Sequence, residues 1–212
     1  MKALLSTTYF GPVQWYQKLY RHEAVEIEQW ESFQKQTYRN RCLIATTQGV
    51  QALTVPIERG TSQLIRDIRI SDHGNWRHLH WNALVSAYGE SPFFEYYQDD
   101  IRPFFENRWD YLFDFNEAIR CQMCELLDIQ PKVSLTQSWG QAPEAEPSEP
   151  VPMTASMNAD FRSAINPKHP LPDPDFEPKP YYQVYQQEHG FLPNLSILDL
   201  LFNMGPEGIF YL

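Results

Sequence analysis

Glycine is scarce in this sequence, with nine among 212 residues. None of the nine belongs to the phosphate-binding patterns GxGxxG and GxxxxGK(S/T), or to the nucleophile elbow GxSxG. The chain therefore lacks the local signatures of dinucleotide-binding folds, P-loop NTPases and α/β-hydrolases.

Cysteine is also rare, and the three present are too few for a disulfide framework. Cys121 and Cys124 form a CxxC pair inside a predicted helix over 116–128, but the second ligand pair of a zinc site is missing. A reactive dithiol needs the positive N-terminus of a helix, and this pair lies in mid-helix. We interpret the two cysteines as buried neighbours on one helix face and predict no metal site.

No apolar stretch reaches the eighteen residues of a membrane span. The three-residue apolar run in the opening MKALLSTTYF is too short for the apolar region of a signal peptide. The sequence therefore predicts a cytoplasmic protein without a membrane span. The net charge of −10 disfavours a nucleic-acid partner, because phosphate binding requires a basic surface. A local basic pocket is compatible with this charge, since net charge does not locate the individual charges.

Hydrophobic residues are abundant at 42%, and aromatic residues make up 15% of the chain. This composition is typical of a packed globular protein and excludes wholesale disorder. The length fits one domain. We therefore predict a single domain over 1–212.

The first third of the chain is rich in strand patterns. Strands are predicted over 3–6, 25–28, 41–46, 52–57 and 65–70 from runs and alternations of apolar residues. A helix over 12–20 begins at Pro12, because proline is tolerated in the first turn. Gln48-Gly49 marks a hairpin between the third and fourth strands.

The middle of the chain is helical and is followed by a proline-rich segment. Helices are predicted over 75–88, 91–105 with a break near Pro103, and 116–127. Ten of the seventeen prolines lie in 143–180, which should form an extended surface segment without a long helix or internal strand. A short final helix begins near Ser196, with Asp199 at capping-box spacing. This order predicts an α+β fold, or an irregular α/β layer with helices on one sheet.

A basic cluster from Lys35 to Arg41 gathers three cations and two amides on an acidic chain. Guanidinium and ammonium groups suit phosphate or carboxylate oxygens, and amides suit sugar hydroxyls. We predict that Lys35, Arg39 and Arg41 bind the anionic group of a substrate and that Asn40 orients a hydroxyl. The alternative is an amphipathic strand edge whose cations pair with nearby acids, namely Glu23, Glu26, Glu28 and Glu31.

Three of the six histidines lie between positions 73 and 80. His78 and His80 are two residues apart, so on a helix they point about 200° apart and cannot share a metal. His80 shares a helix face with Trp76 and Leu84, and Tyr88 lies further along it. A histidine beside an aromatic surface suits a general base, and it equally suits a core histidine bonded to a carbonyl. We predict that His80 is a partly accessible general base in the cleft of the basic cluster, with Tyr88 as a supporting residue.

The order of motifs along most of the chain resembles the WbqC-like protein family. The similar segments include Tyr9-Phe10-Gly11-Pro12, Arg39-Asn40-Arg41, Leu53-Thr54-Val55-Pro56, Trp76-Arg77, His80, Tyr88, Ser91-Pro92-Phe93-Phe94, Asn116 and 191–203. The chain departs from the family where Thr7-Thr8 replaces a frequent Gln-Pro pair and where Glu28 replaces a frequent Asp.

The family is named for a gene product found among O-antigen biosynthesis genes. The resemblance implies a transferase-type enzyme of O-antigen or other cell-surface polysaccharide biosynthesis, acting on a phosphorylated or nucleotide-linked sugar substrate. It implies no particular cofactor. The alternative is a non-catalytic binding or scaffold protein whose basic cluster recognises an acidic partner. The enzyme hypothesis requires Lys35, Arg41 and His80 around one concave pocket, whereas dispersal of these residues favours the alternative.

Overall fold

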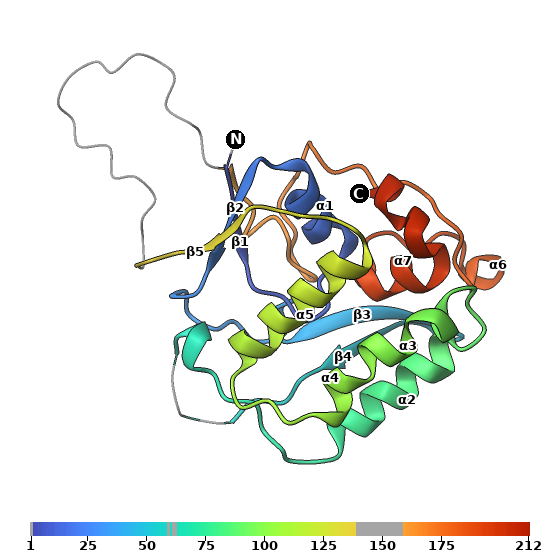
Figure 1. Ribbon diagram of the computed structural model, residues 1–212, viewed down its shortest axis with the longest axis horizontal. Coiled ribbons are helices and arrows are strands. Elements are labelled where there is room, and N and C mark those ends of the chain that lie inside the picture. Colours follow the sequence, from blue (N-terminus) through green and yellow to red (C-terminus); the bar gives the residue numbers. More distant parts are fainter. Residues whose placement is uncertain (1, 59, 61–62, 139–158) are drawn as a thin grey trace.

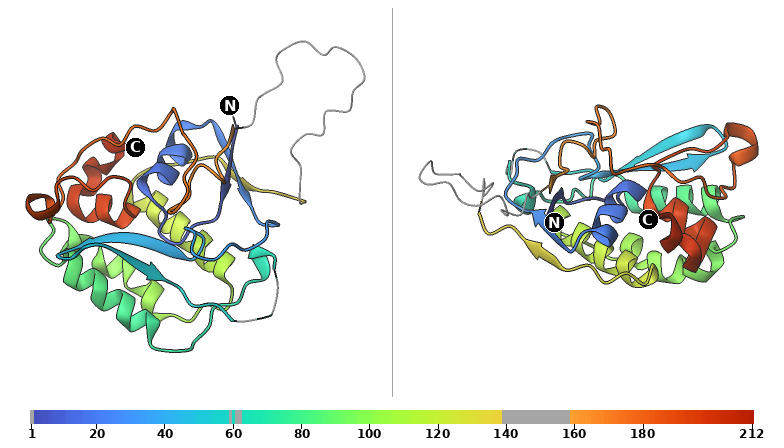
Figure 2. Two further views of the ribbon diagram at one scale, coloured as in Figure 1. Left: turned by 180° about the vertical axis from the view of Figure 1, so that it is seen from behind. Right: turned by 90° about the horizontal axis from the view of Figure 1, so that it is seen from above.

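Two separate sheets organise the fold of the computed structural model, which describes residues 2–58, 60, 63–138 and 159–212. A parallel sheet lies on one side of the molecule, and helices α2 (Trp76–Tyr88), α3 (Phe94–Ile101) and α4 (Pro103–Glu106) lie on the other (Figure 1). An antiparallel hairpin crosses between them, as the view from behind also shows (Figure 2). The predicted α+β class is confirmed.

The parallel sheet has the strand order β5–β2–β1–β6. Its strands are β5 (Val133–Leu135), β2 (Ala24–Glu28), β1 (Lys2–Ser6) and β6 (Ala159–Asp160). Each neighbouring pair is parallel. The short strands β5 and β6 were not predicted, because two or three residues are too few to show a period-two pattern.

The unit β1–α1–β2 forms where the sequence predicts it, within two residues at each boundary. Alternate side chains of β1 and β2 are fully buried. This pattern is expected because successive side chains of a strand point to opposite faces of the sheet. Helix α1 (Val13–Arg21) follows Pro12, whose fixed φ of −69° suits the residue before a helix. The helix therefore leads directly from the end of β1 back to the start of β2.

The hairpin consists of β3 (Arg41–Thr46) and β4 (Gly49–Thr54). Thr46 pairs with Gly49, whose φ of +97° permits a two-residue turn. Because pairing starts at Gly49 itself, β4 begins three residues earlier than predicted and ends at Thr54 rather than at 57.

The predicted strand over 65–70 is wrong. Residues Ile65–Asp67 form a 3-10 turn, and the following residues make only isolated bridges. Ile65 and Ile68 are both buried at a spacing of three, while Arg66 is exposed between them. Alternating apolar and charged residues thus bury one side of a tight turn here instead of one face of a strand.

The helices match their predicted positions with two differences at their starts. Helix α3 begins at Phe94, three residues after the predicted start at 91. The third predicted helix, α5 (Leu112–Leu126), begins four residues before 116, because its buried face already includes Leu112, Phe113 and Phe115. The predicted break at Pro103 is confirmed, since α3 ends at Ile101 and α4 starts at Pro103. No helix among the described residues has the length and apolarity needed to cross a membrane.

The described part of the proline-rich segment, residues 159–180, is called the strap below. After the edge strand β6 it contains no helix, in agreement with the prediction, while 143–158 lie outside the described residues. The strap is fixed to α1 by the Lys18 ammonium, which lies 2.9 and 2.8 Å from the two carboxylate oxygens of Asp173. Both side chains are almost fully buried.

The chain ends with α6 (Gln186–His189), α7 (Ile197–Met204) and the 3-10 helix η2 (Gly205–Tyr211). Ser196 caps α7 by accepting a hydrogen bond from the Leu198 amide at 3.3 Å. The Asp199 carboxylate does not return to the Ser196 amide, which bonds to the Leu43 carbonyl instead. Only half of the predicted capping box is therefore present.

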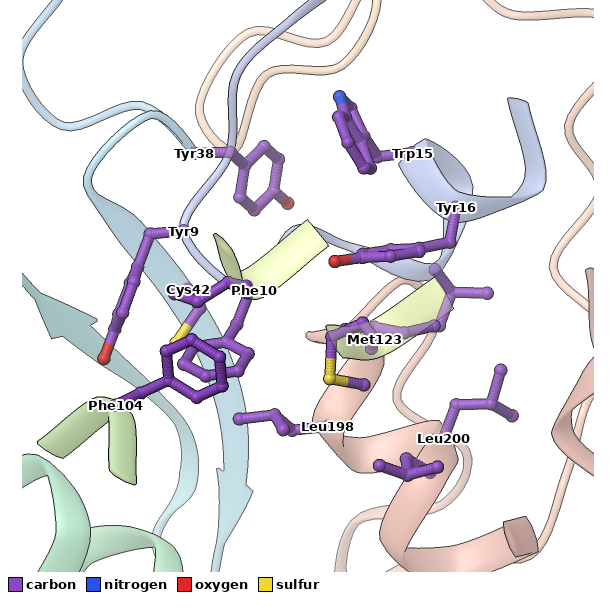
Figure 3. Close-up of a cluster of buried hydrophobic side chains, with 14 of the residues drawn as sticks. Tyr9, Phe10, Trp15, Tyr16, Tyr38, Cys42, Phe104, Met123, Leu198 and Leu200 are labelled. Atoms are coloured by element: carbon purple, nitrogen blue, oxygen red, sulfur yellow. The ribbon is translucent and has the colours of Figure 1, made fainter. Parts of the chain in front are cut away.

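The buried core joins the elements on which the site depends. Tyr9 and Phe10 of the β1–α1 loop lie beside Cys42 of β3, Met123 of α5 and Leu198 of α7 (Figure 3). All five side chains are at most 1% exposed. The loop that follows β1 is therefore held from three sides by tightly packed side chains.

Candidate functional site

The carboxyl ends of the parallel strands meet at one edge of the sheet. From β1 the chain passes through α1 to β2, then to β5 beyond β2, and it returns as β6 on the opposite side of β1. In open α/β sheets, ligands bind outside the carboxyl ends of the strands where the strand order reverses. In this chain that switch point lies between β1 and β6.

A crevice opens at the switch point. Its wide part has a volume of about 350 Å³ and lies between the loop after β2 and the strap. Its polar wall includes Glu31, Gln34, Arg39, Arg162, Asn166 and His169. A second, narrow part of about 10 Å³, called the narrow chamber below, lies at the end of β1, and Arg39 and Arg162 line both parts.

Arg39 is a buried cation that joins three segments at the crevice. Its Nε and Nη2 bind the two carboxylate oxygens of Glu31 at 2.7 and 2.5 Å. Nη2 also donates to the Ser6 hydroxyl at the end of β1, at 2.8 Å. The side chains of Arg39 and Glu31 are 5% and 7% exposed, so this bidentate pair is shielded from water.

Arg162 is the more accessible cation of the crevice, with 28% of its side chain exposed. Its Nε and Nη2 bind Asp160, and its Nη1 lies 3.5 Å from the buried carboxylate of Glu28. Burial alone would raise the pKa of Asp160, but the hydrogen bonds and charge of Arg162 hold it below its usual value. Glu28 also accepts hydrogen bonds from the Trp30 amide and the Thr136 hydroxyl.

Two threonines at the end of β1 line the narrow chamber. Thr7 and Thr8 are 1% and 5% exposed, and neither hydroxyl has a hydrogen-bond partner among the described residues. A Cβ at Gly11 would lie 2.4 Å from the Thr8 hydroxyl oxygen, so glycine is required there for this loop to close. Two residues of the chamber wall thus have buried hydroxyls without a partner in the part of the chain that the structure describes.

The N-terminus of α1, where phosphates bind in many doubly wound folds, is closed in this chain. The Val13 amide donates to the Leu195 carbonyl, and the Gln14 amide donates to the Asn194 side-chain oxygen, both at 3.0 Å. Because these two first-turn amides are occupied, an anion would have to bind through side chains of the crevice instead.

The arrangement can be compared with known proteins. The model of the WbqC-like protein family matches residues 7–211, which include all the residues that line the crevice except Leu5 and Ser6. The chain belongs to the WbqC-like protein family. It is also 30% identical over 195 residues to the uncharacterized protein Rv1507c of Mycobacterium tuberculosis, covering 85% of this chain and 83% of that protein. No solved structure matches the chain.

The structure separates the side chains of the predicted basic cluster. Arg39 turns to the sheet edge, whereas Arg41 donates to the Thr54 hydroxyl across the hairpin at 2.9 Å. Asn40 is buried and donates to the Val55 carbonyl, and Lys35 is exposed in the preceding turn. Of the four, Arg39 alone lines the crevice, and its pairing is of the kind expected for the ion-pair alternative. Substrate binding by these residues stays a prediction.

His80 does not line the crevice of this WbqC-like chain, and the expected partial accessibility is not found. It is 7% exposed, with Nδ1 2.9 Å from the Tyr9 hydroxyl. Burial lowers the pKa of the imidazole to about 4, against a smaller opposite effect of the Thr54 backbone. The ring is therefore neutral at pH 7 and helps to hold the β1–α1 loop through Tyr9. Its role as a general base stays a prediction.

Tyr88 belongs to a buried hydrogen-bond network around Asp199. Its hydroxyl donates to Asp199 at 2.9 Å and accepts from the Ala45 amide at 3.1 Å. Tyr181 and Gln183 donate to the other carboxylate oxygen at 2.7 and 2.8 Å. Burial raises the pKa of the Asp199 carboxyl, and the three donors oppose this effect. The network ties α2, β3 and α7 together away from the crevice.

The CxxC pair is divided between core and surface. Cys124 is buried, and burial raises the pKa of its thiol to about 11, whereas Cys121 is exposed. The expectation that both are buried is therefore wrong for Cys121. Among the residues that the structure describes, no group of three or more histidine, cysteine, aspartate or glutamate side chains is arranged to hold a metal ion.

Sequence reasoning missed Thr7, Thr8 and Arg162 as site residues. The two threonines directly follow a predicted strand, which is the position where ligands bind in parallel sheets, so this signal was present. Arg162 lies in the proline-rich segment, and its position depends on the pairing of β6 with β1. Two residues of pairing leave no pattern in the sequence.

Proposed function

We propose that this WbqC-like protein is a transferase-type enzyme that binds a phosphorylated or nucleotide-linked sugar in the crevice. Membership of the family supports a setting in O-antigen or other cell-surface polysaccharide biosynthesis. The observation that carries the proposal is the crevice itself: a polar cavity at the topological switch point, with two arginines in its wall.

Arg162 is the residue that would bind the anionic group. Its Nη1 makes only a 3.5 Å contact with Glu28 among the described residues, so it retains capacity to donate to a ligand oxygen. Four of the five N–H donors of Arg39 are used by Glu31, Ser6 and Thr37, so it would position the wall beside the ligand rather than bind the ligand alone. Asn166 and Gln34 add amide groups that suit sugar hydroxyls.

A general base must come within hydrogen-bond reach of the proton that it removes. In the described state His80 is bonded to Tyr9 beneath the loop, so this role requires the loop to move. His169 lines the wide part of the crevice and is exposed, which makes it the alternative base of this proposal.

A non-catalytic binding protein is the second candidate function. The observation in its favour is the dispersal of Lys35, Arg41 and His80, none of which lines the crevice. In that case the exposed Lys35 would belong to a surface of this protein that binds an acidic partner. A ligand bound in the crevice would then not be converted to product.

A thermal-shift titration tests the proposal. A ligand at 100 times its dissociation constant stabilises the native state by about 2.7 kcal/mol, which is readily detected. We expect a shift with at least one of uridine diphosphate sugars, sugar phosphates, coenzyme A esters and aminoacyl donors. R162Q should remove most of the shift. R102Q is the matched control, because Arg102 is an exposed arginine paired with Glu106 outside the crevice.

The absence of any shift in the unmodified protein, or an unchanged shift in R162Q, would contradict the proposal. Binding without turnover of the bound ligand, together with capture of an acidic protein that depends on Lys35, would support the second candidate.

A further inference from the structure

The outer edge of strand β4 is free at its centre. Leu43 and Ala45 of β3 turn backbone groups away from β4, because the Leu43 carbonyl accepts from the residue before α7 and the Ala45 amide donates to the Tyr88 hydroxyl. In an antiparallel ladder the partners of such residues also face outward. Ala52 and Val50 therefore turn their amides and carbonyls away from β3, and no described residue bonds to these four groups.

This edge lacks the usual protection. Exposed sheet edges are commonly blocked by a charged side chain, a proline or a bulge. Strand β4 reads Gly-Val-Gln-Ala-Leu-Thr, so it has no charged residue and no proline, and its register with β3 contains no bulge. Helix α2 covers only one end of the edge, where His80 bonds to the Thr54 backbone. The centre of the edge is therefore open to a further strand.

A groove of about 760 Å³ lies between this edge and α2. Figure 1 shows β4 as the strand of the hairpin nearer to α2. The wall from α2 includes Leu79, Asn82 and Ser86, and the Tyr185 hydroxyl bounds the groove by donating to the Ser86 carbonyl at 3.4 Å. Leu79 and Val50 are 63% and 51% exposed, so apolar surface is available on both sides. The groove shares no lining residue with the crevice.

The walls of the groove define the chemistry of its occupant. Every lining residue is uncharged, although the chain has a net charge of −10. A charged group would lose water in the groove without meeting an opposite charge, so an uncharged occupant matches it. The amides and carbonyls of the free edge present donors and acceptors at the spacing of an extended main chain. A polypeptide strand complements such an edge through its own backbone.

We propose that the groove binds an extended, uncharged peptide segment of another protein, which joins β4 as a third strand of the hairpin sheet. The main chain of this segment bonds to Val50 and Ala52, and its side chains pack against Leu79 and Ser86 of α2. The site is separate from the crevice, so this proposal does not depend on the proposed function.

Hydrogen exchange tests the state of the edge. In the free protein the amides of Val50 and Ala52 should exchange rapidly, whereas those of Gln51 and Leu53, which face β3, should exchange slowly. The probe is a synthetic library of capped octapeptides made from serine, threonine, valine, leucine and glutamine. The peptide that binds most tightly should slow the exchange of the Val50 and Ala52 amides by roughly tenfold or more.

Two variants test the groove. A52P removes an outward amide without removing a bond to β3, and proline is tolerated at such edge positions. It should weaken binding of the peptide by roughly tenfold or more. L79E places a charge in the groove at an exposed position, and it should weaken binding similarly without lowering the melting temperature. L135P is the matched control, because Leu135 lies in the edge strand β5 outside the groove, and the amide of its neighbour Thr136 is the one that bonds to β2.

L135P should keep full affinity for the peptide. The proposal is overturned if no library peptide binds, if the bound peptide leaves both edge amides exchanging rapidly, or if A52P and L79E keep full affinity. Slow exchange of both amides in a free dimer that A52P converts to a monomer would assign the edge to a second copy of this chain. That result would also overturn the proposal.

Discussion

The ion pair between Lys18 and Asp173 gives a sharp test of how the strap is held. The D173N substitution keeps the shape of the side chain and removes its charge. The Lys18 ammonium then stays buried, with its side chain 1% exposed and no carboxylate at 2.8–2.9 Å. Gln14 also loses a charged acceptor at 2.8 Å.

The magnitude follows from the burial of the pair. Removing one partner of a buried ion pair costs about 3–5 kcal/mol, because the other charge is left uncompensated. A domain of this size has a total stability of about 5–15 kcal/mol, so D173N should lose about a fifth of it or more. The K18M/D173L double variant removes both charges and should be less destabilised than D173N.

Urea unfolding followed by tryptophan fluorescence measures these differences. The pKa of Asp173 is depressed below its usual value: burial opposes the charge, but the hydrogen bonds of Lys18 and Gln14 outweigh it. The contribution of the pair is therefore present at neutral pH and is lost as the pH falls below about 4. The free energy of unfolding of D173N should not show this loss as the pH falls below about 4. A loss below about 1 kcal/mol in D173N at pH 7 would show that the pair is solvated and that the strap does not depend on it.

Two further predictions concern the residues first assigned to catalysis. The pKa of His80 in the folded state is about 4, below the value near 6.5 in the unfolded chain. Its contribution to stability is thus present above pH 6.5 and lost toward pH 4, and urea unfolding should show the unmodified protein losing roughly 2 kcal/mol more than H80Q between pH 8 and pH 5. A loss of 10²–10⁴-fold in turnover by H80Q with unchanged ligand affinity would instead support the general base. Y88F should lose about 1–3 kcal/mol of stability, because the Ala45 amide and Asp199 each lose a buried partner, and it should keep its ligand response. Lost turnover at unchanged stability would contradict this structural role for Tyr88.

The sequence predicted those parts of the fold that rest on local patterns. The unit from β1 to β2, the hairpin, helix α2 and the break at Pro103 each carry their own signal in period, turn residue or proline. The strand predicted over 65–70 failed because the spacing of Ile65 and Ile68 also fits a 3-10 turn. Local composition cannot decide between the two when the partner strand is unknown.

The candidate site was less predictable, because contacts distant in sequence build it. Arg39 was identified as a cation of interest, yet its direction is fixed by Glu31 and by Ser6, which is 33 residues away. Arg162 reaches Glu28 across 134 residues. The resemblance to the WbqC-like family pointed to His80, whereas the side chains around it bury it. Both departures from the family, at Thr7-Thr8 and at Glu28, fall beside the crevice.

The closure of the α1 N-terminus has a consequence for the order of folding. The Phe10 carbonyl accepts from the Ser196 hydroxyl, a contact that spans 186 residues, and the adjacent amides of Val13 and Ile197 bond across the same gap. Ribosomes add roughly 5–20 residues per second. Ser196 is therefore synthesised on the order of ten seconds or more after the loop that follows β1. The loop that follows β1 therefore makes these contacts only after nearly the whole chain has been synthesised. A chain interrupted before residue 195 would leave the Phe10 carbonyl and the Val13 amide without these partners.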